Sequence, residues 1–533
     1  MEVHRTHGAL LERLGKHAEA VEAWQRAVKL DEEDPKSLTR LGVSLAQTAA
    51  WDDARKSLTR AVKIRPDIGE AFKWLGKACL EQKDLDAAKD HLTSALEIDS
   101  SWAEGFALSG RLHEEKGELK VAEERLTKAV ELDPEDASLK ALLGQVRVKL
   151  EKWGDAVPPL TAAVKARPDD GALRLALGEA QLRSGGEGLE ALRAAVERLP
   201  EEAEAHALRG EAAAKAEERE EAIAAYEEAT RLAPARTEWL GPRAALLAEL
   251  ERWEEASKVY AQALEAHPDE STLWSGQGGV LQKLGRHEES ADAYAKAVKL
   301  GGGDSTQLLI DLGLGYVRAE QWERARDALE KCAALSPGNA EVWESLGLAL
   351  SRLDALPEAE RAYDQALGAE PGRGRAKRAL AEVRARLGKK EQAVDTYRDA
   401  IEALPPEPEL HAALAAVLRD LGRDEEAADE LEKAVELAPQ DAALLCRLGV
   451  AAAAAGRWER SYDALDHSVG FDPRSAEAHH ALGVAAAKLD KRGAAVKAFA
   501  RAVEIDEGRG ESWHALGLAH RALRGLVIGG ELG

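Results

Sequence analysis

The sequence predicts an all-α protein, a right-handed solenoid of helix-turn-helix repeats, because small residues recur every 34 positions along most of the chain. The first column of small residues consists of Gly8, Gly42, Gly76, Gly110, Gly144 and Gly178. Two alanine columns keep the same spacing, namely Ala20, Ala54, Ala88, Ala122 and Ala156, and Ala27, Ala61, Ala95, Ala129 and Ala163. A fixed period of this kind indicates a stack of similar units in which each unit contacts only its neighbours.

Each repeat contains two amphipathic helices. When the repeat is numbered from residue 1, apolar or small residues fall at positions 3, 7, 8 and 11, and again at 17, 20, 24, 27 and 28. Spacings of three and four are the helical period. A turn is expected at positions 14 to 16, where glycine supplies the positive φ that ends a helix, as at Gly15, Gly117, Gly285, Gly388, Gly422 and Gly456. Proline at position 32 marks the end of the second helix, as at Pro66, Pro134, Pro168 and Pro337.

One repeat carries a complete family pattern. The segment Val342-Trp343-Glu344-Ser345-Leu346-Gly347 is followed by Ala359, Tyr363, Ala366 and Pro371. This pattern resembles the tetratricopeptide-repeat (TPR) family, whose 34-residue units are helix-turn-helix pairs. We count fifteen full repeats over residues 1–509 and the first helix of a sixteenth over 510–523. The resemblance implies a superhelix whose first helices line a concave groove, with positions 2, 5, 6, 9, 12 and 13 facing into it.

The deviations from the period divide the chain into five segments. Repeats 1 to 7 occupy residues 1–236 and repeats 10 to 15 occupy 306–509, and both segments are regular. The intervening segment 237–305 contains Gly241-Pro242, further glycines at 276, 278 and 279, and Gly301-Gly302-Gly303 as a connector. Because glycine and proline destabilise helix interiors by roughly 1 and 3 kcal/mol, we expect a soft segment and a bend there; the alternative is sequence drift without a mechanical role. A terminal half-repeat helix over 510–523 and an irregular tail over 524–533 complete the chain.

Three further irregularities are local. Repeat 6 lacks two residues around Gly185-Gly186-Glu187-Gly188. Pro158-Pro159 lies early in the second helix of repeat 5 and is expected to shorten or kink it. After Ala522 the pattern stops, which is compatible with an imperfect cap, with a longer parent chain, or with a partner that covers this end.

The charge and the cysteine content restrict the classes of partner. There are 97 acidic and 73 basic residues, which gives a net charge of −24. This balance argues against nucleic acid and against anionic membranes as partners, since both require a basic surface. The three cysteines suggest no disulfide framework, so a cytoplasmic location is expected. No signal peptide and no apolar stretch of the roughly 18 residues that a membrane span needs is found.

A basic strip is expected in the groove of repeats 1 to 4. It consists of Arg5, Lys36, Arg40, Lys73, Lys77 and Arg111. Such a strip could bind the carboxylates of an acidic or C-terminal peptide segment. Glu70, Glu104 and Glu114 interrupt the strip, so ordinary solvated groove charge is the alternative. The chaperone-binding TPR domains and the O-linked glucosamine transferases use groove asparagines, and this chain has a single asparagine, Asn339, in a loop.

Another column of the repeat contains residue types that bind metal ions. Cys446, His480 and His514 share position 5 of successive repeats. Neighbouring helices lie roughly 8–10 Å apart, whereas zinc ligands converge to about 2.0–2.3 Å from the ion, so we expect neither a metal site nor a cofactor. No catalytic motif was found. Tryptophans at position 17 are expected to be packing residues, namely Trp51, Trp153, Trp253, Trp322 and Trp458.

The sequence therefore predicts a non-enzymatic scaffold that binds peptide segments or partner proteins in a concave groove. One alternative is the recognition arm of a larger multidomain enzyme, such as a kinase or a glycosyltransferase. Another is a structural repeat protein that assembles with itself. The sequence specifies neither the partner nor the oligomeric state.

Overall fold

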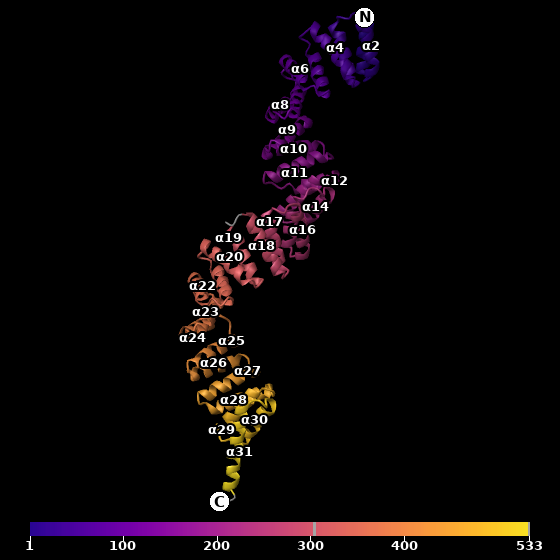
Figure 1. Cartoon of the computed structure of the whole chain (residues 1–533). Helices are drawn as coiled ribbons and strands as arrows, with labels where there is room; N and C mark the ends of the chain where they lie inside the picture. The colour runs from indigo at the N-terminus through magenta and orange to yellow at the C-terminus, as the bar shows by residue number, and fades with distance from the viewer. Residues whose placement is uncertain (302–304, 531–533) are drawn as a thin grey trace. The chain divides into compact units, whose positions relative to one another are not determined.

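The computed structural model describes residues 1–301 and 305–530, and over these ranges every regular element is an α-helix. The chain divides into two compact units, an N-terminal half, Met1–Ala266, and a C-terminal half, His267–Gly533. Within each half, successive helices pack on one another in chain order (Figure 1). The boundary between the halves falls inside the segment 237–305, for which the sequence predicts a bend. That bend stays a prediction.

The odd-numbered helices are the first helices of the repeats. In the N-terminal half they are α1 (Glu2–Arg13), α3 (Pro35–Gln47), α5 (Gly69–Glu81), α7 (Ala103–Glu115), α9 (Ala137–Lys149), α11 (Gly171–Arg183), α13 (Ala203–Lys215) and α15 (Leu240–Glu249). In the C-terminal half they are α17 (Ser271–Lys283), α19 (Thr306–Arg318), α21 (Ala340–Arg352), α23 (Gly374–Arg386), α25 (Pro408–Asp420), α27 (Ala442–Ala454), α29 (Ala476–Lys488) and α31 (Gly510–Gly530).

The even-numbered helices are the second helices of the repeats. In the N-terminal half they are α2 (His17–Leu30), α4 (Trp51–Ile64), α6 (Leu85–Ile98), α8 (Leu119–Leu132), α10 (Trp153–Ala166), α12 (Leu189–Arg198), α14 (Arg219–Leu232) and α16 (Trp253–Ala266). In the C-terminal half they are α18 (His287–Gly301), α20 (Trp322–Leu335), α22 (Leu356–Ala369), α24 (Lys390–Ala403), α26 (Asp424–Leu437), α28 (Trp458–Phe471) and α30 (Arg492–Ile505).

The predicted turn at position 15 adopts a positive φ in each of the fifteen full repeats. Seven of these residues are glycines with φ between 72° and 87°. The other eight are ordinary residues with φ between 55° and 61°, such as Ala49, Glu151 and Asp354. Since this conformation is unfavourable for residues with a Cβ, the packing of the two flanking helices must enforce it.

The glycine column at position 8 lies against the second helix of the same repeat. A Cβ on Gly76 would lie 2.6 Å from Cδ2 of Leu92, which belongs to position 24 of the same repeat. Larger side chains occupy position 24 elsewhere, with Trp24 against Gly8, Tyr363 against Gly347 and Phe499 against Gly483. These position-24 side chains are buried, so the glycine provides the space into which the second helix inserts its largest core residue.

The sequence predicts that Pro158-Pro159 shortens or kinks α10. The shortening is wrong, because α10 has the same 14 residues as the regular second helices, and the kink stays a prediction. Proline at 159 removes the donor that would bond the carbonyl of Asp155. The guanidinium of Arg147 on the preceding helix donates to this carbonyl instead, with Nη1 to O at 2.9 Å. A side chain from the neighbouring helix therefore replaces a missing backbone hydrogen bond.

Three other boundaries differ from the sequence-based expectation. Helix α15 begins at Leu240, so Gly241 and Pro242 lie in its first turn. N–H groups in the first turn have no acceptor within the helix, so the N–H that proline lacks costs no helical hydrogen bond. Helix α31 continues to Gly530, so residues 524–530 are helical and the tail predicted over 524–533 is wrong there; no proline interrupts this stretch. Most of the connector Gly301-Gly302-Gly303, and residues 531–533, lie outside the described residues.

Candidate functional site

The predicted basic strip lies on the first helices of repeats 1 to 4. Arg5 is on α1, Lys36 and Arg40 are on α3, Lys73 and Lys77 are on α5, and Arg111 is on α7. All six therefore belong to the helices that the family resemblance assigns to the groove. Lys36 is exposed and Arg111 is half-buried.

Four of the six strip cations are bound to carboxylates of the chain itself. Arg5 pairs with Asp34 and also donates from Nε to Ser37 Oγ at 3.1 Å. Arg40 lies 3.2 Å from Glu70 and 3.7 Å from Glu12, and Lys77 lies 3.5 Å from Glu104. Among the described residues, Lys36 and Arg111 make no ion pair.

Lys73 contacts both a carboxylate and an aromatic ring of the chain. Its ammonium donates to Asp99 Oδ2 at 2.7 Å and lies 4.7 Å from the ring centre of Trp102. The hydrogen bond from Lys73, together with two from Ser101, lowers the pKa of Asp99 to about 2. An acidic ligand that recruited Lys73 would have to displace this carboxylate.

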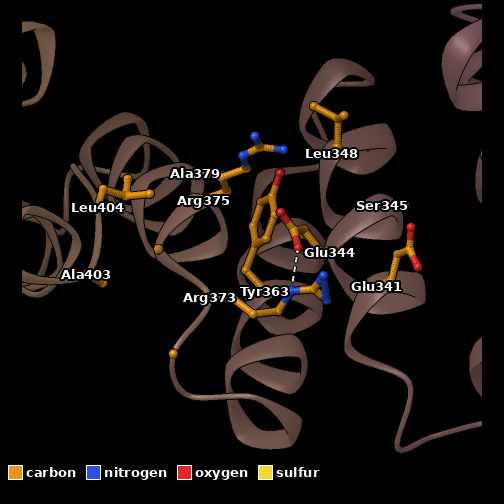
Figure 2. Close-up of a pocket in the computed structure, with 12 residues that line it drawn as sticks. Glu341, Glu344, Ser345, Leu348, Tyr363, Arg373, Arg375, Ala379, Ala403 and Leu404 are labelled. Atoms are coloured by element: carbon orange, nitrogen blue, oxygen red, sulfur yellow. Dashed lines mark ion pairs between the residues drawn. The ribbon is translucent and has the colours of Figure 1, made fainter. Parts of the chain in front are cut away.

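The C-terminal half contains a pocket of about 530 Å³ between successive first helices. Helix α21 lines it with Glu341, Glu344, Ser345 and Leu348, and α23 and its preceding loop line it with Arg373, Arg375 and Ala379. Figure 2 shows Tyr363, from α22, between these two walls. A volume of this size is typical of ligand pockets.

The charges of this pocket fall into two groups. Arg373 is paired inside the pocket, with Nε 2.9 Å from Glu344 Oε2, as the dashed line in Figure 2 shows. Glu341 and Arg375 are exposed and form no ion pair among the described residues. Both occupy position 2 of their repeats, so an unpaired anion and an unpaired cation stand on adjacent first helices. Burial raises the pKa of the Tyr363 hydroxyl, which is therefore a neutral donor at ordinary pH.

An ion cluster between successive repeats was not predicted from the sequence. Glu360, at position 21, lies with Oε1 3.3 Å from Arg384 Nε and with Oε2 2.6 Å from Lys389 Nζ, both in the next repeat. Glu123 makes the same contacts with Arg147 at 3.2 Å and Lys152 at 2.5 Å. The detectable signal was the shared spacing, since the two glutamates and their partners occupy the same repeat positions.

In the column of Cys446, His480 and His514, the first two are engaged in ordinary contacts and His514 is exposed. His480 Nδ1 lies 2.8 Å from Ser512 Oγ, and its ring packs edge-on against Phe499. Burial, reinforced by the charge of Glu477, raises the pKa of the Cys446 thiol to about 11. Within the described residues, no three His, Cys, Asp or Glu side chains are placed to hold a metal ion.

The described helices include none with the length and apolar character that a bilayer span requires. The other two cysteines, Cys79 and Cys332, are buried and unpaired.

Family models described as tetratricopeptide repeat match most of the chain. One model matches residues 5–67, 49–101, 141–185, 186–237, 243–305, 310–373 and 352–408; a second matches 408–451, and a third 103–136 and 476–509. A search among curated proteins returned no match.

Solved structures similar to this chain include three helical repeat proteins. YrrB, a TPR protein with an unusual peptide-binding site, is 24% identical over 36% of this chain and 98% of its own, with a TM-score of 0.34. The structure of Naa15/Naa10 bound to HypK-THB matches 93% of this chain and 97% of its own at 14% identity, with a TM-score of 0.35. The Cut9–Hcn1 hetero-tetramer of the APC/C matches 97% of this chain and 96% of its own at 14% identity, with a TM-score of 0.29.

Proposed function

Because the chain belongs to the tetratricopeptide-repeat family, we propose that it is a non-enzymatic scaffold that binds extended peptide segments of partner proteins along its first helices. The family is generally a non-catalytic protein-interaction fold. Stacked repeats suit this role because they present a long surface on which several peptide residues can be read at once. The free thiols support the further proposal of a reducing, cytosolic location.

The pocket between α21 and α23 is the observation that carries the proposal. Adjacent first helices pack roughly 8–10 Å apart, and a peptide in the polyproline II conformation advances about 3.1 Å per residue with three residues per turn, so residues three apart share a face. The pair Glu341 and Arg375 therefore suits a peptide that carries a basic and an acidic side chain three residues apart. Arg375 would bind the carboxylate by charge-assisted hydrogen bonds, and Glu341 would bind the base.

The test uses two capped peptides of alanine and serine that differ only in the order of one lysine and one glutamate, placed three residues apart. We expect calorimetry on the full chain to show that one order binds more tightly. Arg375→Glu should weaken the binding of that peptide by about 1 kcal/mol, as is typical of a partly exposed ion pair. The double variant Glu341→Arg and Arg375→Glu should invert the preference. Equal affinity for both orders would argue against this site.

The N-terminal strip stays part of the proposal through Lys36 and Arg111, which are unpaired among the described residues. If the strip binds acidic peptides, reversing these two charges should weaken the binding of a glutamate-rich peptide. The affinity of the lysine and glutamate peptide proposed to bind between α21 and α23 should not change. If the strip is solvated groove charge, neither peptide will respond.

A further inference from the structure

The second helix of repeat 6 lacks its first turn. Helix α12 has 10 residues, whereas the regular second helices have 14. The turn after α11 is still regular, because Gly185 has a positive φ of 87° and Gly186 donates to the carbonyl of Gln181 at 2.8 Å, as position 16 does in other repeats. Only Glu187 and Gly188 then precede Leu189, so positions 17 to 20 of a regular repeat are reduced to two residues.

In five other repeats, position 17 is a tryptophan, namely Trp51, Trp153, Trp253, Trp322 and Trp458. Trp322 and Trp458 occupy it in repeats 10 and 14, and each is the first residue of its second helix. A cation at position 13 of the following repeat lies over each ring. Arg352 is 5.6 Å from the ring centre of Trp322, and Lys488 is 5.4 Å from that of Trp458.

A pocket of about 460 Å³ lies at the corresponding place in repeat 6. The shortened loop forms one side, and Leu182 and Ala212, which are both buried, contribute apolar surface. Lys215 lines the pocket from α13 and occupies position 13 of repeat 7, the position of Arg352 and Lys488. Its ammonium extends toward the carbonyl of Leu182, at 3.5 Å. Repeat 6 thus lacks the aromatic ring, whereas repeat 7 retains the cation that covers such a ring at Trp322 and Trp458.

We propose that this pocket binds the indole side chain of a tryptophan from a partner peptide, with Lys215 over the ring. The chain's own Trp322 and Trp458 are the structural precedent for this occupant. A cation over an indole is the strongest pairing of its type among the aromatic side chains, and the apolar floor favours a ring over a polar group.

The charges around the pocket specify the residues that flank the tryptophan. Glu187, Glu190 and Glu218 line it, whereas Arg193 already binds Glu190, Glu218 and Glu221. Since Glu190 and Glu218 are paired with Arg193, the exposed Glu187 is the lining carboxylate that forms no ion pair among the described residues, and it attracts a basic group. The ligand is therefore a tryptophan with a lysine or an arginine beside it.

The experiment uses a capped tripeptide of lysine, 5-fluorotryptophan and lysine, which is titrated with the full chain and followed by fluorine NMR. The fluorine label separates the ligand from the twelve tryptophans of the chain. We expect a saturable change in shift and line width. A tripeptide with leucine in place of the tryptophan should compete at least tenfold more weakly, and equal competition would overturn the proposal.

Two variants place the binding at this pocket. In the first, Glu187-Gly188 is replaced by the four residues found at positions 17 to 20 of repeat 8, Trp253-Glu254-Glu255-Ala256, which restores the 34-residue length. This internal tryptophan should fill the pocket and reduce peptide affinity at least tenfold. In the second, Lys215→Ala should weaken binding about threefold, the size expected of an exposed cation–π contact.

Lys488→Ala is the matched control, because it removes a position-13 cation that already covers a tryptophan. It should leave the peptide affinity unchanged. Circular dichroism verifies that each variant is folded. If the filled variant fails to fold, Lys215→Ala still decides the matter, since unchanged affinity in that variant contradicts the proposal. Arg375→Glu should not affect this peptide, so the outcome is independent of the proposed groove site.

Discussion

At the scale of single residues, stability depends on matching a small residue with a large side chain inside each repeat. The small residue is glycine in twelve of the fifteen full repeats and alanine in the other three, namely Ala244, Ala381 and Ala415. Gly76 and Leu92 exemplify the match, and Gly347 with Tyr363 is its aromatic counterpart. In many repeats the position-24 residue has the largest buried side chain. The glycine at position 8, which faces it, allows the two helices of the repeat to approach closely. Where position 8 is glycine, the position-24 side chain fills the space that a Cβ would occupy.

Gly76→Ala is predicted to destabilise the chain by about 1–3 kcal/mol, because the added methyl overlaps Leu92 in a core that has no spare volume. Gly154→Ala is the matched control, since Gly154 also lies in a helix but has no atom within 4 Å of the Cβ position. That change should stabilise the chain by up to about 1 kcal/mol through helix propensity. Urea unfolding measures both effects, and similar values for the two variants would refute the packing argument.

At the scale of helices, contacts between side chains and neighbouring helices compensate for local irregularities. Helix α10 keeps its length because Arg147 bonds a carbonyl that a proline leaves without a donor. The same residue binds Glu123, and the equivalent Arg384 binds Glu360. Each repeat is thus joined to the next by buried apolar surface and, at these two places, also by a charged cluster.

The Glu360 cluster should make stability dependent on pH. Burial opposes ionisation of Glu360, but hydrogen bonds from Lys389 and Arg384 outweigh it and lower the pKa below the ordinary 4.5. A lowered folded-state pKa means that the cluster stabilises fully above pH 4.5 and loses this contribution as the pH falls through the lowered value. Glu360→Gln should therefore cost about 1–3 kcal/mol at neutral pH and much less near pH 3.

Glu22→Gln is the control for this prediction. Glu22 forms an exposed pair with Arg26, at 3.6 Å. Exposed pairs contribute little, so this variant should unfold like the native chain at both pH values. A pH-independent cost in Glu360→Gln would indicate that packing of the side chain, and not its charge, matters.

At the scale of the whole molecule, the chain consists of two compact halves of similar size. Contacts in a solenoid are local, so each half has the neighbours that its own helices need. We predict that residues 1–266 and 267–533 fold when expressed separately, and that their far-ultraviolet circular dichroism spectra sum to that of the intact chain. An unfolded spectrum for either fragment would show that the halves depend on each other.

The 34-residue period predicted the fold because helix faces, turns and helix ends depend on local residue types. It failed where a contact from another segment decides the outcome, as with Arg147 and Asp155. The groove charges show the same limit. The period places Arg5 and Lys73 on the first helices, but their partners Asp34 and Asp99 come from the ends of the same repeats, outside the columns considered. A periodic pattern identifies a face, whereas the reach of a side chain from an adjacent loop requires coordinates.

The pairing of each position-8 glycine with a position-24 side chain has an evolutionary consequence. Both members of a pair lie within one 34-residue stretch, so duplication, loss or transfer of a whole repeat carries the pair intact. A point change at one member alone produces a clash or a void. Such an array can therefore gain or lose whole repeats without separating the two members of this contact.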